Sequence, residues 1–551
     1  MSAITKFRNP IVAGFAPDPS VVLVNGTYFL VTSSFHIFPG LPIYASRDLQ
    51  SWVHISNAID RPGQLSLANA SSRTFTLDAG HALIATGGLF AATIRHHHGT
   101  FYIVCTNLSS CNGSTEMQNF IIKTSDIWGA SWSDPIPVEF NGIDPSLFFD
   151  DDDRAYFQGS FVIDRSTQPS CTIKQVEIDV GTGNQLSEQR EIWCGYAKHD
   201  TEGPHVYKVD GWYYLLVAEG GTFEHHLLSI ARSKNIWGPY ESFEGNPIMT
   251  ADGKNEYVQN VGHGELFQDQ QGRWWAAVLG VRDDQGCAAL GRESFLTPVE
   301  WPEGGWPQIA QPRMDFERES AESSAHLAAD AETDENPLRS PPDVGNVYIR
   351  DPDLSKYRLP ASEEGNITLL PSLSSLSTPT GTSTFLGRRQ RSLTGNATTR
   401  LVLSGVLSSR TGIRAGLATY RDSIRHVSLV YNSDTHTVNC HAVNSLTGLD
   451  RISSTQLPLG SGTQAVWFKI QASPTAWSFH AKLDFAEGLG SEGVGEFSVS
   501  RLDWVRLETI MVRELDARDF TGPIFGLFAQ TSTSGGEEVE VTFSDFSLGG
   551  E

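Results

Sequence analysis

The sequence is poor in cysteine and has no long hydrophobic run. Its 551 residues include 6 cysteines, and no two of them have the Cys-x-x-Cys spacing of a zinc or redox site. A disulfide-based scaffold is therefore excluded, although Cys105 and Cys111 could form a single bridge if they are not two buried thiols. No apolar run is long enough to cross a bilayer, so no membrane association is expected.

Basic residues are also scarce. Lysine and arginine number 40 against 64 aspartates and glutamates, which gives a formal net charge of −24 at pH 7. Such a surface repels phosphate backbones and argues against a nucleic-acid partner, but it does not oppose a neutral ligand such as a sugar. The N-terminus "MSAITKFRNP" lacks the apolar core of a secretory signal. The chain as given is expected in the cytoplasm by default, or outside the cell if a leader has been removed.

An internal repeat organises residues 1–315. Each copy joins a turn signal to an aromatic, β-rich run, which is the signature of a hairpin leading into a strand. The five copies are "NGTYFLVTS" from Asn25, "HGTFYIVCT" from His98, "DDRAYFQGS" from Asp152, "DGWYYLLVA" from Asp210 and "QGRWWAAVL" from Gln271. Little 3.6-residue periodicity accompanies them, so the pattern predicts a β-propeller rather than an α/β barrel.

The character of the sequence changes after residue 315. Residues 316–345 are acidic and rich in serine and alanine, which predicts a linker or mobile loop. Residues 346–551 contain short alternating segments such as "TRLVLSG", "HVSLVYN" and "VEVTFSDFSLG", which predict a separate antiparallel β-sandwich. We therefore expect an all-β protein of two domains, since the chain is too long for one ordinary core.

Three acidic residues occur in similar local settings. Asp18 in "APDPS", Asp144 in "GIDPS" and Glu202 in "TEGPH" precede a proline directly or by one residue, and a β-like segment follows each. Proline pushes the residue before it toward extended geometry, so the direction of Asp18 is largely preset. Propeller strands that begin near the axis would bring such side chains together. Paired carboxylates cleave glycosidic bonds, one as proton donor and one as base or nucleophile, and a third can raise the donor's pKa.

These motifs resemble glycoside hydrolase family 43, the β-xylosidases and α-L-arabinofuranosidases. The resemblance begins with "NPIVAGFAPDPSVV" and continues through "AATIRHHHGTFYIV", "GIDPSLFFDDD", "TEGPHVYK", "AEGGTFEHH", "NVGHGELF" and "LGRESFLTPVEW" to "DFTGPIFGLFAQ". It spans both predicted domains. It implies a five-bladed propeller followed by a concanavalin A-like, jelly-roll sandwich, with an inverting exo-glycosidase pocket at the propeller axis.

The resemblance also implies roles for individual residues. Asp18 is expected to be the general base that activates water, Glu202 the general acid, and Asp144 the carboxylate that tunes and orients the acid. Arg292 in "LGRESF" is expected to contact the substrate. His263 in "VGHGEL" is expected to face the sugar or to coordinate an ion, directly or through water. No cofactor is required, and any Ca²⁺ in the propeller channel would be structural.

Further residues are expected around the pocket. Phe35 matches an aromatic residue of the pocket wall, and Thr222 and His226 match residues near it. Phe520 matches the place where the sandwich reaches over the pocket mouth. If the second domain caps the site in this way, it limits the depth of the pocket and favours chain-end substrates.

One departure from the family pattern bears on the sugar. Many relatives carry Trp-Ala-Pro where this chain has Phe90 and Ala91 followed by a second alanine, at the sugar subsite. Phenylalanine is smaller than tryptophan and lacks its N–H donor, so the preferred sugar stays open. The run His96–His98 next to this segment is interpreted as a solvated hairpin turn, with metal ligation as the alternative.

The expected function is an exo-acting, inverting hydrolase that releases terminal β-D-xylose, α-L-arabinofuranose or both from xylan- or arabinan-derived glycans. One alternative is an α-L-arabinofuranosidase whose main activity is to debranch arabinoxylan. Another is a non-catalytic carbohydrate-binding propeller, although neither the base nor the acid is missing. An endo-arabinanase shares the propeller but generally lacks the large second domain. The expected partner is a saccharide substrate, and a homo-oligomer is left open.

Overall fold

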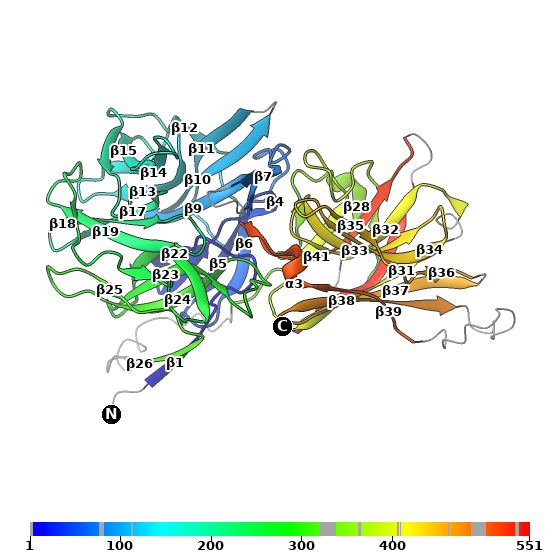
Figure 1. Cartoon of the computed structure of the whole chain (residues 1–551). Helices are drawn as coiled ribbons and strands as arrows, with labels where there is room; N and C mark the ends of the chain where they lie inside the picture. Colours follow the sequence, from blue (N-terminus) through cyan, green and yellow to red (C-terminus); the bar gives the residue numbers. More distant parts are fainter. Residues whose placement is uncertain are drawn as a thin grey trace.

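The protein is built almost entirely of β-strands, as the computed structural model in Figure 1 shows. The structure describes residues 4–550 except 77–81, 112–113, 130, 320–337, 362–364, 405–406, 408, 461, 486–502 and 535–538. Two short helical elements lie within these ranges, η2 (Leu354–Lys356) and α3 (Val512–Leu515). Neither they nor any other helix of the described part has the length and apolar character needed to traverse a membrane. The predicted all-β class is confirmed.

Five antiparallel sheets are formed by residues 20–309, and neighbouring strands in each follow chain order, except that β21 of the fourth sheet pairs with β19. The first holds β2 (Ser20–Val24), β3 (Thr27–Val31), β5 (Gly40–Ser46) and β6 (Val53–Ile59), and the second β9 (Gly88–His97), β10 (Thr100–Cys111), β11 (Ser114–Thr124) and β12 (Ile136–Val138). The third holds β13 (Ile143–Phe149), β14 (Ala155–Val162), β15 (Cys171–Ile178) and β16 (Arg190–Trp193). The fourth holds β17 (Glu202–Val209), β18 (Trp212–Glu219), β19 (Leu227–Ser233), β20 (Glu241–Ser242) and β21 (Met249–Thr250), and the fifth β22 (Val258–Gln268), β23 (Trp274–Arg282), β24 (Glu293–Glu300) and β25 (Gln308–Ile309).

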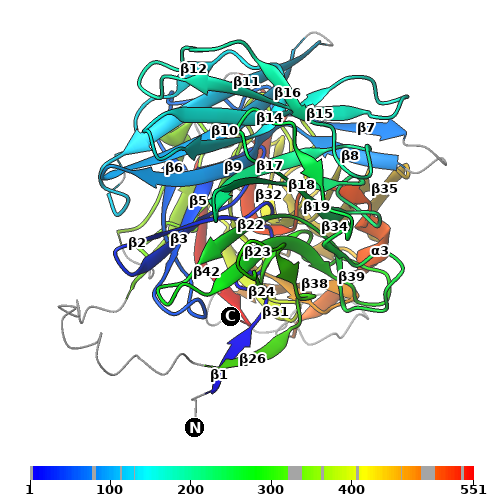
Figure 2. The same cartoon turned by 90° about the vertical axis from the view of Figure 1, so that its left-hand side faces the viewer.

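These sheets form a closed ring. The first strand of each sheet contacts the first strands of two others: β2 contacts β9, β9 contacts β13, β13 contacts β17, β17 contacts β22, and β22 returns to β2. Figure 2 faces this part of the molecule, with β9, β17 and β22 near the middle of the view. We interpret the five sheets as the blades of the predicted propeller, whose first strands surround the axis.

The predicted turn signals form tight hairpins between the first two strands of three blades. Asn25 and Gly26 join β2 to β3 with φ of 48° and 77°, and Asp210 and Gly211 join β17 to β18 with φ of 50° and 71°. His98 and Gly99 do the same between β9 and β10. Two successive residues with positive φ are what a two-residue type I′ turn requires, which explains the glycine at the second position.

The second domain is a sandwich of two sheets, to the right in Figure 1. One sheet has the order β28 (Tyr357–Arg358), β29 (Ile367–Leu369), β42 (Val541–Gly549), β31 (Gly395–Val402), β37 (Thr463–Ala472), β38 (Ala476–Phe485) and β39 (Val505–Met511). The other has the order β30 (Phe385–Arg389), β41 (Ile524–Thr531), β32 (Ile413–Tyr420), β33 (Arg425–Asn432), β34 (Thr437–Asn444) and β35 (Leu449–Ile452), with β36 (Leu457–Pro458) beside β34. Buried residues such as Leu417, Leu429, Trp477 and Phe479 fill the space between the sheets.

Short strands join the two domains. β4 (Ile37–Phe38) from the first blade region pairs with β27 (Tyr348–Ile349), and β40 (Arg518–Asp519) adds in parallel to β8 (Ala82–Thr86), which pairs with β7 (Ser72–Thr76). A buried apolar cluster that includes Phe15, Phe35, Tyr420 and Phe528 draws on both domains. The sandwich is thus packed directly against the part of the propeller that contains Phe15 and Phe35.

The predicted linker begins later in the chain than the sequence indicated. Residues 316–319, placed in the linker from sequence, belong to β26 (Asp315–Glu319), which pairs with β1 (Ile4–Arg8). Most of the remaining predicted linker lies outside the described residues.

Cys105 is a buried free thiol, so the bridge to Cys111 that the sequence left open is not formed.

The N-terminal segment is tied to the last blade by Asn9. Its buried side-chain amide donates to the carbonyl oxygens of Leu296 and Arg313, each at 2.8 Å, and its Oδ1 accepts from the backbone N–H of Leu296 at 2.8 Å. One side chain therefore satisfies three backbone groups that lie about 290 residues away along the chain.

Asn9→Ala is expected to lower the free energy of unfolding by about 2–4 kcal/mol, because it leaves buried backbone groups without partners. The measurement is urea unfolding followed by tryptophan fluorescence. Gln50→Ala, at an exposed position, is the matched control and should leave the midpoint in place. An unchanged midpoint for Asn9→Ala would show that water replaces the amide at this position.

Candidate active site

The three predicted carboxylates lie where inner strands of three blades begin. Asp18 precedes β2, Asp144 is the second residue of β13, and Glu202 is the first residue of β17. The expectation of extended backbone before proline is wrong for the first two, since φ is 55° at Asp18 and 54° at Asp144. Gly203, next to Glu202, also has a φ of 55°. Positive φ at non-glycine residues costs about 1–3 kcal/mol each, so the surrounding structure holds these carboxylates in place.

Asp18 is surrounded by groups that stabilise its charge. The Ser33 hydroxyl donates to Oδ2 at 2.5 Å, Arg292 Nη1 lies 3.5 Å from Oδ1, and His263 Nδ1 lies 3.9 Å from the same oxygen. Burial favours the neutral form, but Arg292, His263 and Ser33 outweigh it and hold the pKa of Asp18 below its usual range. Asp18 is therefore a carboxylate at neutral pH and can accept a proton.

Glu202 is in the opposite situation. Burial and the negative charges of Asp144 and Asp200 raise the pKa of Glu202 well above its ordinary value, and Asp18 acts in the same direction. The neutral form of Glu202 is therefore favoured, and in that form the carboxyl group can donate a proton. Since both Asp144 and Asp18 contribute to this shift, the three carboxylates share one electrostatic environment.

Asp144 has an intermediate character. Burial and the neighbouring Asp18 raise its pKa to about 6, although the positive charges of His263 and Arg292 oppose the shift. His263 Nδ1 lies 3.8 Å from Oδ2 of Asp144, so this imidazole lies within 4 Å of two of the three carboxylates. Asp144 is placed to act on Glu202 through its charge.

Arg292 connects the site to the sandwich. Its Nε and Nη2 donate to the carbonyl oxygen of Phe520 at 3.3 and 3.0 Å, and its Nη1 donates to Thr222 Oγ1 at 3.0 Å. Its guanidinium carbon also lies 5.4 Å from the ring centroid of Phe35 and 5.0 Å from that of Phe520. The structure therefore brings Thr222, Phe35 and Phe520 together with Asp18.

Aromatic rings form one side of the site. The ring centroids of Phe35 and Phe90 lie 5.1 Å apart, those of Phe35 and Phe520 5.6 Å, and those of Phe90 and Phe520 6.0 Å. Phe35 is almost fully buried, whereas Phe90 and Phe520 are half-buried. Ala91 follows Phe90 in β9 and is buried. Two of the three rings come from the propeller and the third from the sandwich.

The two predicted histidines lie against glycines. His226 Nδ1 is 3.0 Å from the carbonyl oxygen of Asn260, and burial lowers the pKa of His226 to about 3, so its ring is neutral. A Cβ atom on Gly262 would lie 2.4 Å from that ring, and one on Gly203 would lie 2.9 Å from the ring of His263. Both glycines are thus needed where a ring packs on the backbone.

Sequence reasoning missed Ser33 and the packing role of Gly203. Ser33 is one of three consecutive small polar residues after β3, and nothing in its local pattern singles it out. Gly203 lies inside the "TEGPH" motif that identified Glu202. A glycine directly after a candidate acid and before proline is a signal that a close contact needs the missing side chain.

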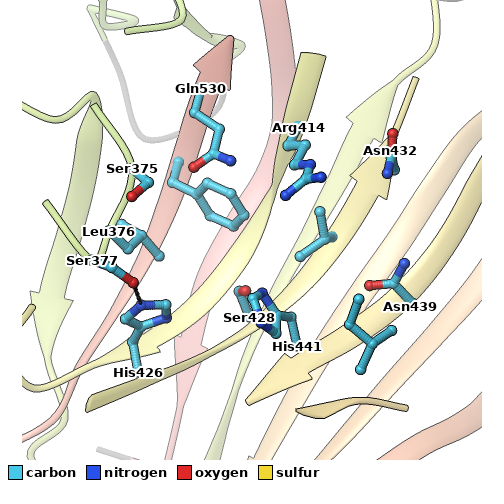
Figure 3. Close-up of a pocket in the computed structure, with 13 residues that line it drawn as sticks. Ser375, Leu376, Ser377, Arg414, His426, Ser428, Asn432, Asn439, His441 and Gln530 are labelled. Carbon is cyan, nitrogen blue, oxygen red and sulfur yellow. Dashed lines mark hydrogen bonds between the residues drawn. The ribbon is translucent and has the colours of Figure 1, made fainter. Parts of the chain in front are cut away.

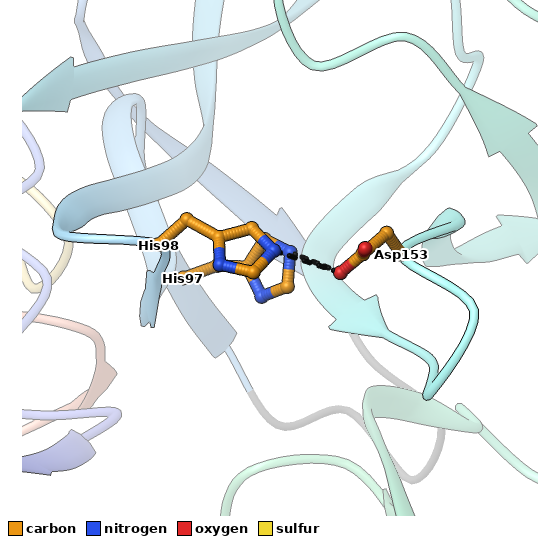
Figure 4. A group of neighbouring side chains, drawn as sticks. All are labelled: His97, His98 and Asp153. Carbon is orange, nitrogen blue, oxygen red and sulfur yellow. Dashed lines mark hydrogen bonds and ion pairs between the residues drawn. The ribbon is translucent and has the colours of Figure 1, made fainter.

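The structure offers little support for a metal at His263. Ca²⁺ prefers oxygen ligands, and among the described residues His263, Asp18 and Asp144 do not form a group whose ligand atoms all lie within 4.8 Å of one another. His97, His98 and Asp153 do form such a group, at the opposite ends of β9 and β13 from Phe90 and Asp144 (Figure 4). His98 Nε2 and His97 Nε2 lie 2.8 and 3.2 Å from Asp153 Oδ1, so the three side chains are grouped by their contacts with one carboxylate oxygen.

Two family models match the chain. The model of Glycosyl hydrolases family 43 matches residues 7–307, and that of the Beta xylosidase C-terminal Concanavalin A-like domain matches residues 343–548. The chain belongs to glycosyl hydrolase family 43. It is a glycosidase, and the predicted concanavalin A-like type of its second domain is confirmed.

Several family 43 relatives cover much of the chain. The non-reducing end alpha-L-arabinofuranosidase of Bacteroides ovatus is 32% identical over 491 residues, which is 86% of this chain and 85% of that protein. The xylosidase/arabinosidase of Butyrivibrio fibrisolvens is 40% identical over 318 residues, 55% of this chain and 56% of that protein. The crystal structure of xylan beta-1,4-xylosidase from Bacillus halodurans has a TM-score of 0.81 at 28% identity and covers 99% of this chain and 100% of that one.

Ser33→Ala is expected to raise the pKa of Asp18, because it removes a hydrogen bond to the charged form. The acidic limb of the pH profile of kcat/KM on an aryl glycoside should then move up by about 1 pH unit. Ser33→Thr keeps the hydroxyl and should leave the limb in place. An unmoved limb in folded Ser33→Ala would mean that Asp18 is not the group that titrates there.

Proposed function

We propose that this family 43 enzyme is an exo-acting, inverting hydrolase that removes terminal pentoses, β-D-xylose, α-L-arabinofuranose or both, from xylan- or arabinan-derived glycans. The observation that carries the proposal is the separation of pKa values at the site: Asp18 below and Glu202 well above its ordinary range. Two carboxyl groups whose pKa values are pushed apart can serve as base and acid at the same pH. The names of the relatives support the pentose class.

In the proposed reaction, Glu202 transfers its proton to the oxygen of the leaving group as the bond to the anomeric carbon breaks. A water on the opposite face of the sugar attacks that carbon and gives its proton to Asp18. The configuration inverts, and proton exchange with solvent restores both groups after the products leave. Inversion by this route needs the two carboxyl groups about 6.5–9.5 Å apart, with room for the water between them.

Arg292 and Asp144 would act on these two groups. Arg292 lies 3.5 Å from Asp18 and stabilises its carboxylate before the proton arrives. The charge of Asp144 raises the pKa of Glu202, which keeps the acid protonated. His263, 3.9 and 3.8 Å from Asp18 and Asp144, is proposed to face the sugar rather than a metal ion.

The pocket wall is proposed to determine chain-end action. Phe520 extends from the sandwich to the rings of Phe35 and Phe90 and closes one side of the site. Thr222, His226 and Ala91 would complete the subsite for the terminal sugar. A wall contributed by a second domain limits how much of a polymer can pass, which favours release of single units over internal cleavage.

The second candidate is an α-L-arabinofuranosidase that mainly debranches arabinoxylan. The relative from Bacteroides ovatus, which bears the name of a non-reducing end alpha-L-arabinofuranosidase, matches 86% of this chain and thus both domains. The ring of Phe90 packs against that of Phe35, and this position, where many relatives of the family carry tryptophan, is proposed to line the sugar subsite and to decide between the two sugars.

Family 43 enzymes generally need no cofactor, and every proton step above is assigned to a protein side chain. A Ca²⁺ ion in the channel, reached by His263 directly or through water, would be structural. A homo-oligomer stays a prediction.

The proposed function is tested with 4-nitrophenyl β-D-xylopyranoside and 4-nitrophenyl α-L-arabinofuranoside. Asp18→Ala should lose activity on both by roughly 10³-fold or more, because no group then accepts the proton of water. Glu202→Gln should lose far more activity on xylobiose than on a dinitrophenyl xyloside, whose leaving group needs little protonation. Proton NMR of the first product should show the inverted anomer. Equal loss on both leaving groups would contradict the role of Glu202, and retention of configuration would contradict inversion.

Asp144→Asn is expected to lower the pKa of Glu202, because it removes the neighbouring negative charge that raises it. Activity needs protonated Glu202 and falls as pH rises through its pKa, so the alkaline limb of the kcat/KM profile should move down by about 1 pH unit. Asp134→Asn, which is exposed and distant from the site, is the control. An alkaline limb that stays in place would mean that Asp144 does not act on the acid through its charge.

A further inference from the structure

A polar hollow lies on the outer face of one sandwich sheet, in strands β41, β32, β33 and β34 (Figure 3). The strands alternate: Ile413, Ala415 and Leu417 of β32 face the core between the sheets, while Arg414 lies on the opposite face. Pairing places Gln530, Arg414 and Asn432 in one row across three strands. We name it the sandwich hollow.

Small residues create the depression. One row runs from Phe528 through Gly416 to Val430 and Asn439, and glycine there leaves the backbone uncovered between larger side chains. The loop that contains Ser375 and Ser377 forms a wall above the sheet. The volume of the hollow is about 180 Å³. This suits one small ligand unit rather than a drug-sized molecule.

The sandwich hollow contains polar groups without partners. Asn439 and Ser428 are more than nine-tenths buried, and neither side chain makes a hydrogen bond to any residue that the structure describes. At the rim, Gln530 is half-buried and Arg414 is exposed, and neither side chain makes a hydrogen bond to a described residue. His426 Nε2 lies 2.8 Å from Ser377 Oγ, while its buried Nδ1 has no partner in the described part of the chain. Buried polar groups are normally paired, so the unpaired Nδ1 of His426 points to a ligand that supplies its partner, and the other side chains lie where the same ligand could pair with them.

The chemistry of the set defines the ligand. Amides and hydroxyls predominate, and each can donate and accept hydrogen bonds. Burial lowers the pKa of His426 to about 3, so its ring is neutral, and His441 Nε2 lies 2.6 Å from Asp450 Oδ1. Arg414 is the remaining cation that lines the hollow among the described residues. The apolar side chains of Val430 and Phe528 lie beside these groups, as a sugar ring with hydroxyls at its edge requires.

The sandwich hollow is also continuous with the interface between the domains. Val430, Phe528 and Leu376 line it and at the same time belong to the buried cluster that contains Phe35 of the candidate active site. Phe90 and Phe520 pack against the same cluster. A glycan held in the sandwich hollow would therefore be bound on the sheet face that also packs against the catalytic domain.

We propose that the sandwich hollow binds one sugar unit of a neutral polysaccharide and holds the polymer on the enzyme, separately from the catalytic pocket. The choice of a neutral glycan rests in part on the proposed function. Amides and hydroxyls from Asn439, Gln530 and Ser428 would pair with sugar hydroxyls, and Arg414 would donate to hydroxyl oxygens at the rim.

The test is native gel electrophoresis of the full chain in gels that contain soluble arabinoxylan, linear arabinan or polygalacturonate. Glu202→Gln is the common background, so that the polymer stays intact. The double variant Arg414→Ala/Gln530→Ala should bind one of the neutral polymers about tenfold more weakly, seen as weaker retardation in that gel, because two hydrogen-bonding side chains are lost. Gln50→Ala/Gln471→Ala, at exposed positions on the propeller and the other sheet, is the control and should bind as the background does. Asn439→Leu fills the floor and should give the same loss as the double variant.

Retardation that is unchanged in both hollow variants, or that falls equally in the control, would overturn the proposal. Stronger retardation by polygalacturonate than by the neutral polymers would overturn the neutral class. In the background with Glu202 intact, the hollow variants should keep kcat/KM on both aryl pentosides. If the aryl pentosides are not cleaved but retardation still depends on Arg414 and Gln530, the proposed activity is wrong and the proposed binding site stands. If the aryl pentosides are cleaved but retardation does not depend on these two residues, only the proposed binding site is wrong.

Discussion

Arg292 joins the two domains at the point where the candidate base lies. Its guanidinium lies 3.5 Å from Asp18 and donates twice to the carbonyl oxygen of Phe520 in the sandwich. It is buried, so a lost partner would not be replaced by water at little cost. The charge of Asp18, the position of Phe520 and the docking of the sandwich therefore depend on one side chain. The second domain is in this sense part of the site rather than an appendage.

The segment that carries Phe520 is itself held by buried charges. Arg425 pairs with Asp519 and with Asp422, and all three side chains are buried. Burial lowers the pKa of Arg425 and the two carboxylates raise it, with a net rise above its ordinary range. An arginine shared by two carboxylates gives a fixed geometry, because its planar fork matches their oxygens. Phe520 thus reaches the propeller from a rigid support.

A second buried network lies among the inner strands of the five blades. Glu265 of β22 accepts from Ser20 Oγ at 2.5 Å and pairs with Arg95 of β9 at 2.5 Å, and Arg95 Nε donates to the carbonyl oxygen of Leu147 in β13 at 2.9 Å. His205 of β17 lies 3.7 Å from Glu265. Residues from all five inner strands meet here, and Ser20, Leu147 and His205 follow Asp18, Asp144 and Glu202 by two or three residues along the chain. Such a network resists the relaxation of the strained backbone at Asp18 and Asp144.

Much of this protein is encoded in local sequence. The Asn-Gly, His-Gly and Asp-Gly pairs specify tight turns, because only residues that tolerate positive φ fit them. The alternation after residue 346 predicts strands of a half-buried sheet, and the motifs around Asp18, Asp144 and Glu202 identify the candidate carboxylates.

Tertiary structure decided in which direction the pKa of each carboxyl group shifts. The pKa of Asp18 is lowered because Arg292 and Ser33 lie beside it, whereas burial and Asp144 raise the pKa of Glu202. The contact between Arg292 and Phe520, 228 residues apart, and the unpaired amides of the sandwich hollow follow from ring closure and sheet pairing. No local pattern carries these features, since electrostatic fields and contacts depend on distances in space that the chain sets only when both domains are folded and docked.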